Sequence, residues 1–274
     1  MSSLDSIYQV NAFATPPYLG NPAAVCVLTE DRTDEWMQNL ATQIGLSETA
    51  FLRPLDNNHF HLRWFTPAYE VDLCGHATMA SAHVLWEQNL AASEVIKFES
   101  RSGILEAAPV DSRVQLNFPV TPVTEEEPAS GLVDCFTTEG TVIPVLFSGR
   151  SAFDLFLQYE SEQIVRDMQV DFDRLNEFDV RGVIVTAQGS DEFDVVSRFF
   201  APGAGVEEDP VTGSAHCSLI DFWSQRLGTD QLTGFQASER GGIVHMTRQG
   251  ARVLLGGDAV TDRVLFESWR DLPV

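Results

Sequence analysis

Residues 199–223 read FFAPGAGVEEDPVTGSAHCSLIDFW and contain a strand, an acidic loop and the start of a helix. The strand ends in a proline-glycine turn, and the loop after it carries Glu207, Glu208 and Asp209. Apolar residues then recur at helical spacing, which predicts a helix that begins near Gly213. The first N–H groups of a helix attract anions, although an N-cap Thr or Ser also satisfies them. The pattern is therefore compatible with an anion site and with an ordinary cap.

The same arrangement occurs earlier in the chain. Arg63 to Gln88 reads RWFTPAYEVDLCGHATMASAHVLWEQ, and Arg198 to Gln225 reads RFFAPGAGVEEDPVTGSAHCSLIDFWSQ. Both segments contain a strand, a proline turn, an acidic loop, a small-residue turn and a helix. Their first arginines are 135 positions apart and their tryptophans in the helix are 137 positions apart, so the second loop is longer. The repeat indicates two halves that are related by duplication.

The whole-chain composition limits the class of protein. With 274 residues, the chain is long enough for two domains that each bury a core. Its formal charge of -23 weighs against nucleic acid and anionic membranes as partners. Four cysteines without CxxC spacing are typical of free thiols in a reducing compartment. Because no leader and no apolar run of roughly 18 residues is present, we predict a soluble, cytoplasmic protein.

A change of composition predicts the domain boundary. Residues 119–144 are rich in Pro, Thr and Glu and show little periodicity, which is typical of a linker. We therefore expect one domain over residues 1–122 and a second over residues 123–274. The last strand can return to the first domain.

Glu48 is the most informative single residue of the first half. Residues 46–52, LSETAFL, alternate like a strand, with Glu48 on the same side as Leu46 and Ala50. Burial of a carboxylate raises its pKa and allows it to exchange protons near neutral pH. The alternative interpretation is an edge strand on which Glu48 faces water.

Other polar residues stand at the ends of predicted elements. His76 lies at a helix start, where it can bind a carboxylate or act as acid or base. Cys74 precedes His76 and has two interpretations. It is either a reactive thiol whose pKa is lowered by the helix N-terminus or a small buried residue, and we favour the second. Asn21 follows a glycine at a strand end, where a ligand can contact it. The pair His59 and His61 can bind metal, but no third ligand stands at a suitable spacing, so a solvated strand face is favoured.

Five motifs extend over nearly the whole chain: GNPAAVCVL from Gly20, LSETAFL from Leu46, RWFTPAYEVDLCGHAT from Arg63, FFAPGAGVEEDPVTGSAH from Phe199 and SERGG from Ser238. In this order they resemble the phenazine-biosynthesis PhzF-like family, which is related to diaminopimelate epimerase and proline racemase. The resemblance implies an α+β fold of two pseudo-symmetric domains, each a mixed sheet wrapped as a barrel around a central helix. It also implies a homodimer and a site in the cleft between the domains, with both helix N-termini directed into it.

The functional residues of the family fall on matching positions of this sequence. The resemblance places the acid/base glutamate at Glu48 and the assisting histidine at His76. It places an aspartate of the second domain at Asp209. The expected substrate-binding residues are Asn21, Gly75, Ala77, Gly213 and Ser214. The implied reaction is a proton shift on a small carboxylic acid substrate, without a metal or an organic cofactor.

Two alternatives to a one-base isomerase are considered. Racemases of the wider superfamily use one cysteine in each domain as paired bases. Cys74 stands at the first of these positions, but Pro210 occupies the matching place in the second half, so the one-base mechanism is favoured. A pairing of Cys74 with Glu48 or Asp209 stays open. The other alternative is a non-catalytic carboxylate-binding protein, against which Glu48, His76 and Asp209 argue because a binder needs no proton-transfer residue.

Overall fold

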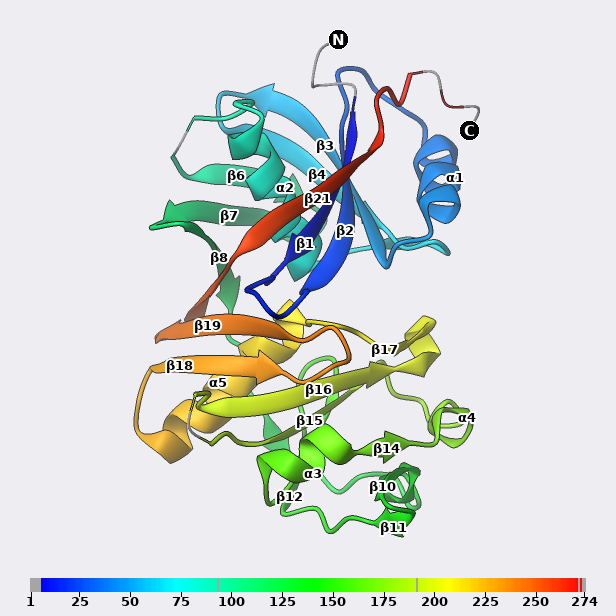
Figure 1. Cartoon of the computed structure of the whole chain (residues 1–274), viewed down its shortest axis with the longest axis vertical. Coiled ribbons are helices and arrows are strands. Elements are labelled where there is room, and N and C mark those ends of the chain that lie inside the picture. Colours follow the sequence, from blue (N-terminus) through cyan, green and yellow to red (C-terminus); the bar gives the residue numbers. More distant parts are fainter. Residues whose placement is uncertain (1–5, 93, 191, 271, 273–274) are drawn as a thin grey trace. The chain divides into compact units, whose positions relative to one another are not determined.

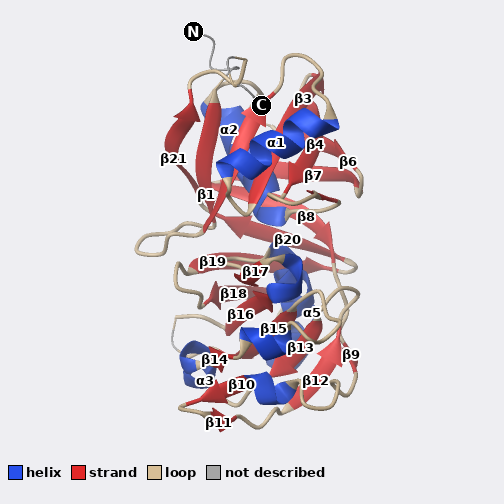
Figure 2. Ribbon diagram, turned by 90° about the vertical axis from the view of Figure 1, so that its right-hand side faces the viewer, coloured by secondary structure: helices blue, strands red, loops and turns tan. Residues whose placement is uncertain are grey.

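The computed structural model describes residues 6–92, 94–190, 192–270 and 272. The chain forms two compact units, one through Asn117 together with the chain from Gly256 onward, and the other from Phe118 to Leu255. Each unit combines a mixed sheet with one long helix (Figures 1 and 2), which confirms the predicted α+β class. Among the described residues, no helix has the length and hydropathy needed to cross a membrane.

The first unit is built on one mixed sheet. Its strands, in order across the sheet, are β21 (Ala259–Phe266), β1 (Ile7–Ala12), β2 (Asn21–Val27), β3 (Glu48–Asp56), β4 (His59–Phe65), β6 (Ile96–Ser100), β7 (Gly103–Val110) and β8 (Arg113–Pro119), with β5 (Glu70–Val71) beside β4. The pairs β2–β3 and β4–β6 are parallel and the others are antiparallel. Parallel neighbours need crossover connections, and these contain α1 (Asp34–Ile44) and α2 (Gly75–Glu87).

The second unit repeats this plan. Its strands, in order, are β9 (Thr124–Glu125), β12 (Phe147–Arg150), β13 (Leu155–Gln158), β15 (Val183–Gln188), β16 (Val195–Ala201), β18 (Gln231–Gln236), β19 (Gly242–Gln249) and β20 (Arg252–Gly257), with β17 (Val206–Glu208) beside β16. The parallel pairs are β13–β15 and β16–β18, in the same places as in the first unit. The crossovers contain α3 (Glu162–Asp167), α4 (Phe172–Leu175) and α5 (Gly213–Leu227). The remaining elements are the 3-10 turns η2 (Val133–Cys135) and η3 (Pro202–Ala204) and a small sheet of β10 (Phe136–Thr138), β11 (Thr141–Val142) and β14 (Gln169–Val170).

Matching ion pairs support the duplication that the sequence predicts. Arg63 on β4 donates two hydrogen bonds to the carboxylate of Glu70 on β5, at 2.7 and 2.6 Å. Arg198 on β16 donates two to the carboxylate of Glu208 on β17, at 2.7 and 2.9 Å. Each pair joins the strand of the repeated motif to the short strand that precedes the central helix. The two halves therefore share strand order, crossovers and side-chain contacts.

The helices α2 and α5 are the central helices of their units. Almost every residue from His76 to Leu85 of α2 is buried, and α2 packs against β1, β2, β3 and β7. In α5 the residues from Ala215 to Ser224 are buried, and α5 packs against β16, β18 and β19. A helix that is buried all round lacks the polar face of a surface helix. His76 lies in the first turn of α2, and Ser214 lies in the first turn of α5.

The caps of α1 determine where β3 begins. The hydroxyl of Thr33 accepts a hydrogen bond from the N–H of Trp36, and Gly45 ends the helix in the left-handed conformation. Met37 and Leu40 of this helix pack into the core of the first unit. The chain then enters β3 at Glu48, two residues later than the start of the predicted strand. The position of Glu48 is thus fixed by a capped helix and a paired strand.

The predicted linker over residues 119–144 is wrong as an interpretation of structure. This stretch contains β9, η2, β10 and β11, and all of them belong to the second unit. Cys135 and Phe136 are fully buried and fix the stretch to the unit despite its composition. The chain passes from one compact unit to the other after Asn117 and again after Leu255, and β21, the last strand, pairs with β1.

Replacing Arg181 is expected to lower the free energy of unfolding more than replacing its partner Asp154. Arg181 donates to both carboxylate oxygens of Asp154, at 2.8 and 2.5 Å, and the side chains are 1% (Asp154) and 45% (Arg181) exposed. Arg181→Met leaves a buried carboxylate, which we expect to lower the free energy of unfolding by about 3 kcal/mol. Asp154→Asn leaves an arginine that water can reach, at a cost of about 1 kcal/mol. Urea unfolding of both variants at neutral pH tests this order, and equal losses would contradict it.

Candidate active site

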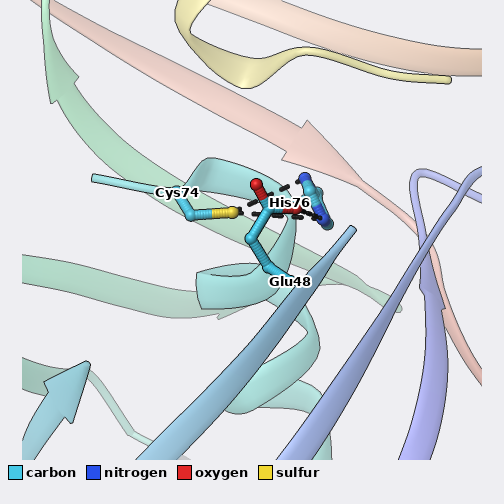
Figure 3. A group of neighbouring side chains, drawn as sticks. All are labelled: Glu48, Cys74 and His76. Atoms are coloured by element: carbon cyan, nitrogen blue, oxygen red, sulfur yellow. Dashed lines mark hydrogen bonds and ion pairs between the residues drawn. The ribbon is translucent and has the colours of Figure 1, made fainter. Parts of the chain in front are cut away.

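Glu48 and His76 meet at the beginnings of two elements of the first unit. Glu48 is the first residue of β3, and His76 is the second residue of α2. The Nε2 atom of His76 lies 3.0 Å from the Oε2 atom of Glu48, and Figure 3 shows the two side chains pointing toward one another. The side chains of His76 and Glu48 are only 5% and 18% exposed, so the alternative of a water-facing Glu48 is wrong.

Two further side chains hold the imidazole of His76. The amide Nδ2 of Asn21, the first residue of β2, lies 3.2 Å from Nδ1, and the hydroxyl of Ser47 lies 3.4 Å from Nε2. A protonated imidazole donates from both nitrogens, whereas a neutral one accepts at one of them. The Asn21 amide can present its nitrogen or its oxygen and so suits either state. Because Asn21 is fully buried, its contact with His76 assigns it a positioning role; substrate binding by Asn21 stays a prediction.

Glu48 and His76 shift each other's pKa. Burial alone raises the pKa of Glu48, but the charge and hydrogen bond of His76, with a hydrogen bond from Ser47, outweigh burial and lower it. Burial disfavours the imidazolium form of His76, but Cys74 and Glu48 outweigh burial and raise its pKa well above 6.5. The pair is therefore a carboxylate and an imidazolium at neutral pH. The sequence-based expectation that burial raises the pKa of Glu48 is therefore wrong, because the contact with His76 lowers it.

Cys74 is a buried thiol beside the pair. Its Sγ atom lies 3.6 Å from Nδ1 and 3.9 Å from Nε2 of His76, and the residue is 7% exposed. Burial, followed by the charge of Glu48, raises the pKa of the thiol, although His76 and the N–H of Ala77 oppose this. The prediction that the helix N-terminus lowers the pKa of the Cys74 thiol is therefore wrong. The preferred interpretation, a small buried residue, agrees with this environment.

The counterpart of Cys74 in the second unit is a threonine. Cys74 is the N-cap residue of α2, and Thr212 is the N-cap residue of α5. The pairing of Cys74 with Pro210 is therefore wrong, because Gly213 begins α5 138 positions after Gly75 begins α2. The loop before α5 is longer than the matched tryptophans indicate. The second cap position, like Pro210, carries no thiol.

Asp209 is tied to the start of α5. The hydroxyl of Thr212 donates to Oδ2 of Asp209 at 2.5 Å. Gln236, on β18, donates through Nε2 to the carbonyl oxygen of Asp209 at 2.6 Å and accepts from the N–H of Thr212 at 2.8 Å. Thr212 therefore does not cap α5 with its side chain. These contacts hold the Asp209 carboxylate next to the helix N-terminus.

Ser214 is the second residue of α5 and accepts a hydrogen bond from Arg181. The Nη2 atom of Arg181 lies 3.3 Å from the Ser214 hydroxyl oxygen. Arg181 itself lies over the rings of Phe153 and Phe199 and is anchored by Asp154. Because the oxygen of Ser214 accepts from Arg181, its hydroxyl hydrogen can be donated to another acceptor.

The predicted site residues fall into two groups. In the first unit Asn21, Glu48 and His76 are in contact, and Gly75 and Ala77 flank His76 on α2. In the second unit Asp209 precedes α5, whose first two residues are Gly213 and Ser214.

Three further residues that contact the candidate site, Ser47, Arg181 and Gln236, are not among those predicted from the sequence. Ser47 stands beside Glu48 in the SETAF motif, which was a usable signal. Arg181 and Gln236 gave none, because each reaches its partner from a segment more than twenty positions away.

The Glu48–His76 pair is expected to give stability a specific pH dependence. The lowered pKa of Glu48 stabilises the fold at pH values above about 4.5, its ordinary pKa, and this stability is lost as the pH falls through the folded-state pKa. The raised pKa of His76 stabilises the fold at pH values below about 6.5, its ordinary pKa, and this stability is lost as the pH rises through the folded-state pKa. Urea unfolding should show the largest difference between wild type and His76→Gln at about pH 5.5 and a smaller one at about pH 10. A difference that does not change with pH would contradict this account.

Fold and site together define an enzyme with a buried carboxylate–imidazole pair on a duplicated α+β scaffold. The sequence profile of the phenazine biosynthesis-like (PhzC-PhzF) family matches residues 10–264. An uncharacterized isomerase of Halalkalibacterium halodurans is 46% identical over 258 residues, which cover 93% of this chain and 95% of the relative. The crystal structure of a PhzF-family phenazine biosynthesis protein of Enterococcus faecalis has a TM-score of 0.88 and 38% identity, covering 95% and 97% of the two chains.

A hydroxyproline epimerase of Agrobacterium vitis shares the fold, with a TM-score of 0.62, 12% identity and coverage of 95% and 91%. The chain belongs to the phenazine biosynthesis-like family and is an isomerase. The resemblance predicted from the five motifs is thereby confirmed.

Proposed function

We propose that this protein is a cofactor-independent isomerase that moves a proton on a small carboxylic acid, with Glu48 as the general acid/base. The observation that carries the proposal is the 3.0 Å contact between the mostly buried Glu48 carboxylate and the imidazole of His76. A general base must be ionised at the working pH and within reach of the proton that it removes. His76 keeps Glu48 ionised although burial opposes the charge.

The proposed reaction is a one-base proton shift. The Glu48 carboxylate takes a proton from a substrate carbon, and the electron pair of that C–H bond delocalises toward the substrate carboxylate or a conjugated double bond. Glu48 then returns the proton to another carbon on the same face of the substrate. The imidazolium of His76 compensates the charge that develops during both transfers. No proton is gained or lost overall.

We assign substrate binding to the N-terminal turns of the two central helices. Neither Cys74 nor Thr212 makes a side-chain cap hydrogen bond, so first-turn N–H groups other than that of Ala77, which faces the Cys74 thiol, keep capacity for an anion. The first-turn residues that we assign to substrate binding are Gly75 and Ala77 in α2, and Gly213 and Ser214 in α5. Asp209 is proposed to bind a hydroxyl or amino group of the substrate, since an ionised carboxylate only accepts hydrogen bonds.

Solvent deuterium exchange tests the proposal. The protein is incubated in D2O with a panel of small cyclic, hydroxy and amino carboxylic acids, and NMR detects label on carbon. We expect label with wild type and with Cys74→Ala, and none with Glu48→Gln. Label that persists in Glu48→Gln would overturn the assignment of the base.

The two-base alternative rests on the 3.6 Å contact of Cys74 with His76. It predicts that label is lost in Cys74→Ala as well. A bound acid that never acquires label would instead favour the non-catalytic alternative. Its binding is checked separately by calorimetry, so that an absent substrate is not mistaken for absent catalysis.

A further inference from the structure

Three metal-ligating side chains converge at one point of the first unit. The donor atoms of Glu48, Cys74 and His76 all lie within 4.8 Å of one another, and no other group of this kind occurs among the residues that the structure describes. Figure 3 shows the thiol, the carboxylate and the ring directed at a common volume. A thiolate, an imidazole and a carboxylate are the ligand types that Zn²⁺ takes in proteins. The donor set therefore fits a borderline-soft divalent cation.

The distances agree with coordination of a single ion. Donor atoms about 2.0–2.3 Å from a tetrahedral Zn²⁺ lie roughly 3.3–3.6 Å from one another. Here Nε2 of His76 lies 3.9 Å from Sγ of Cys74 and 3.0 Å from Oε2 of Glu48. The Glu48 oxygen and Sγ of Cys74 lie within 4.8 Å of one another, so side-chain rotations that move these atoms by up to about 1 Å bring all three donors to bonding distance. The other ring nitrogen, Nδ1, is held by Asn21, as outer-shell partners hold metal-binding histidines.

Burial and attachment favour a preformed site. Cys74 and His76 are 7% and 4% exposed, and both belong to the start of the buried helix α2. Glu48 begins β3, whose pairing with β2 and β4 fixes its backbone. Glu48 keeps 18% of its side chain exposed, which gives a cation a way in from solvent. Rigid elements hold all three ligands, so little ordering is needed when the ion binds.

We propose that Glu48, Cys74 and His76 form a binding site for Zn²⁺ or a similar divalent cation. The ligands are the Cys74 thiolate, Nε2 of His76 and one carboxylate oxygen of Glu48, with water or a substrate carboxylate as the fourth ligand. The thiol proton and the imidazolium proton leave to solvent when the ion binds. The bound ion occupies the lone pair that Glu48 needs for proton transfer. Inhibition by Zn²⁺ therefore follows, and this clause alone rests on the proposed function.

Titration of the full, chelator-treated chain with Co²⁺ tests the site directly. Co²⁺ bound to a thiolate gives a near-ultraviolet charge-transfer band, and tetrahedral Co²⁺ gives intense visible bands. We expect both with wild type, displaced by Zn²⁺, and no charge-transfer band with Cys74→Ala. Glu48→Gln should keep the band but weaken binding at least about tenfold, the lower limit for loss of even an outer-shell partner.

Matched controls separate this site from other metal ligands of the chain. Cys135→Ala removes a different buried thiol, and His59→Ala removes part of the HxH pair on β4. Both variants should keep the wild-type spectrum and affinity. Thermal unfolding checks that each variant is folded, and Cys74→Ser with His76→Gln replaces Cys74→Ala if that protein does not fold.

Three outcomes would overturn the proposal. They are a charge-transfer band that survives removal of the Cys74 sulfur, loss of binding in His59→Ala, and wild-type protein without a thiolate–Co²⁺ band at millimolar Co²⁺. The inhibition clause has its own measurement: Zn²⁺ should suppress deuterium exchange by wild type, and a chelator should restore it. If the Co²⁺ bands appear but no acid acquires label, the metal site stands while the proposed function fails.

Discussion

A Glu48→Gln variant is expected to lose proton exchange by about 10²–10⁴-fold, the contribution of a positioned general base. Gln has nearly the same size and keeps a hydrogen-bonding oxygen toward His76, but it cannot accept the substrate proton. The variant should therefore fold and bind the acid substrate with little change. The rate of deuterium incorporation, measured by NMR at saturating substrate, checks this expectation.

Two controls define the effect of this variant. Glu35→Gln changes an exposed carboxylate in the first turn of α1 and should leave the exchange rate unchanged. Glu48→Asp keeps the charge but shortens the side chain, so it should retain part of the activity. A Glu48→Gln variant that exchanges as fast as Glu35→Gln would exclude Glu48 as the base.

Among the substitutions proposed for this protein, Gly20→Ala is expected to lower the free energy of unfolding most. Gly20 has a φ of +64°, and an added Cβ would lie 2.2 Å from the carbonyl oxygen of Ala12 and 2.8 Å from the N–H nitrogen of Ala14. Backbone atoms cannot rotate away, so the turn between β1 and β2 must move. The left-handed conformation and the overpacking together should lower the free energy of unfolding by about 2–5 kcal/mol.

The same substitution reaches the site, because Gly20 precedes Asn21 and Asn21 holds His76. We therefore expect Gly20→Ala to reduce proton exchange as well as stability. Gly250→Ala is the matched control, since Gly250 has a φ of +61° but no atom within 4 Å of the added Cβ. It should cost only about 1 kcal/mol. Equal losses in urea unfolding would show that the contact with Ala12 has no effect.

The duplication made much of the fold predictable. The two copies of the strand, turn and helix motif gave the central helices α2 and α5 within a few residues. These features depend on local periodicity and capping, which a sequence displays directly. The linker prediction for residues 119–144 was wrong because the buried residues of this segment, Cys135 and Phe136, show no periodic pattern in the sequence. Tertiary burial there overrides composition.

The sequence selected Glu48, His76 and Asn21 as candidates, but it did not show the electrostatics of the cluster that they form. Glu48, His76 and Asn21 come from separate motifs, and the sequence could not show that their side chains are in contact. The pKa of a buried carboxylate depends on the balance between desolvation and its partner. The contact with His76 reverses the direction that burial alone predicts for Glu48. The same is true of Cys74, where burial outweighs the helix N-terminus.

The central claim is that His76 keeps the buried carboxylate of Glu48 ionised and ready to accept a proton. A ¹³C NMR titration of the Glu48 carboxyl carbon, in wild type and in His76→Gln, tests it without a substrate. We predict a pKa below its usual 4.5 in wild type and a clearly higher pKa in the variant. A pKa above 4.5 in wild type, or the same value in both proteins, would contradict the account.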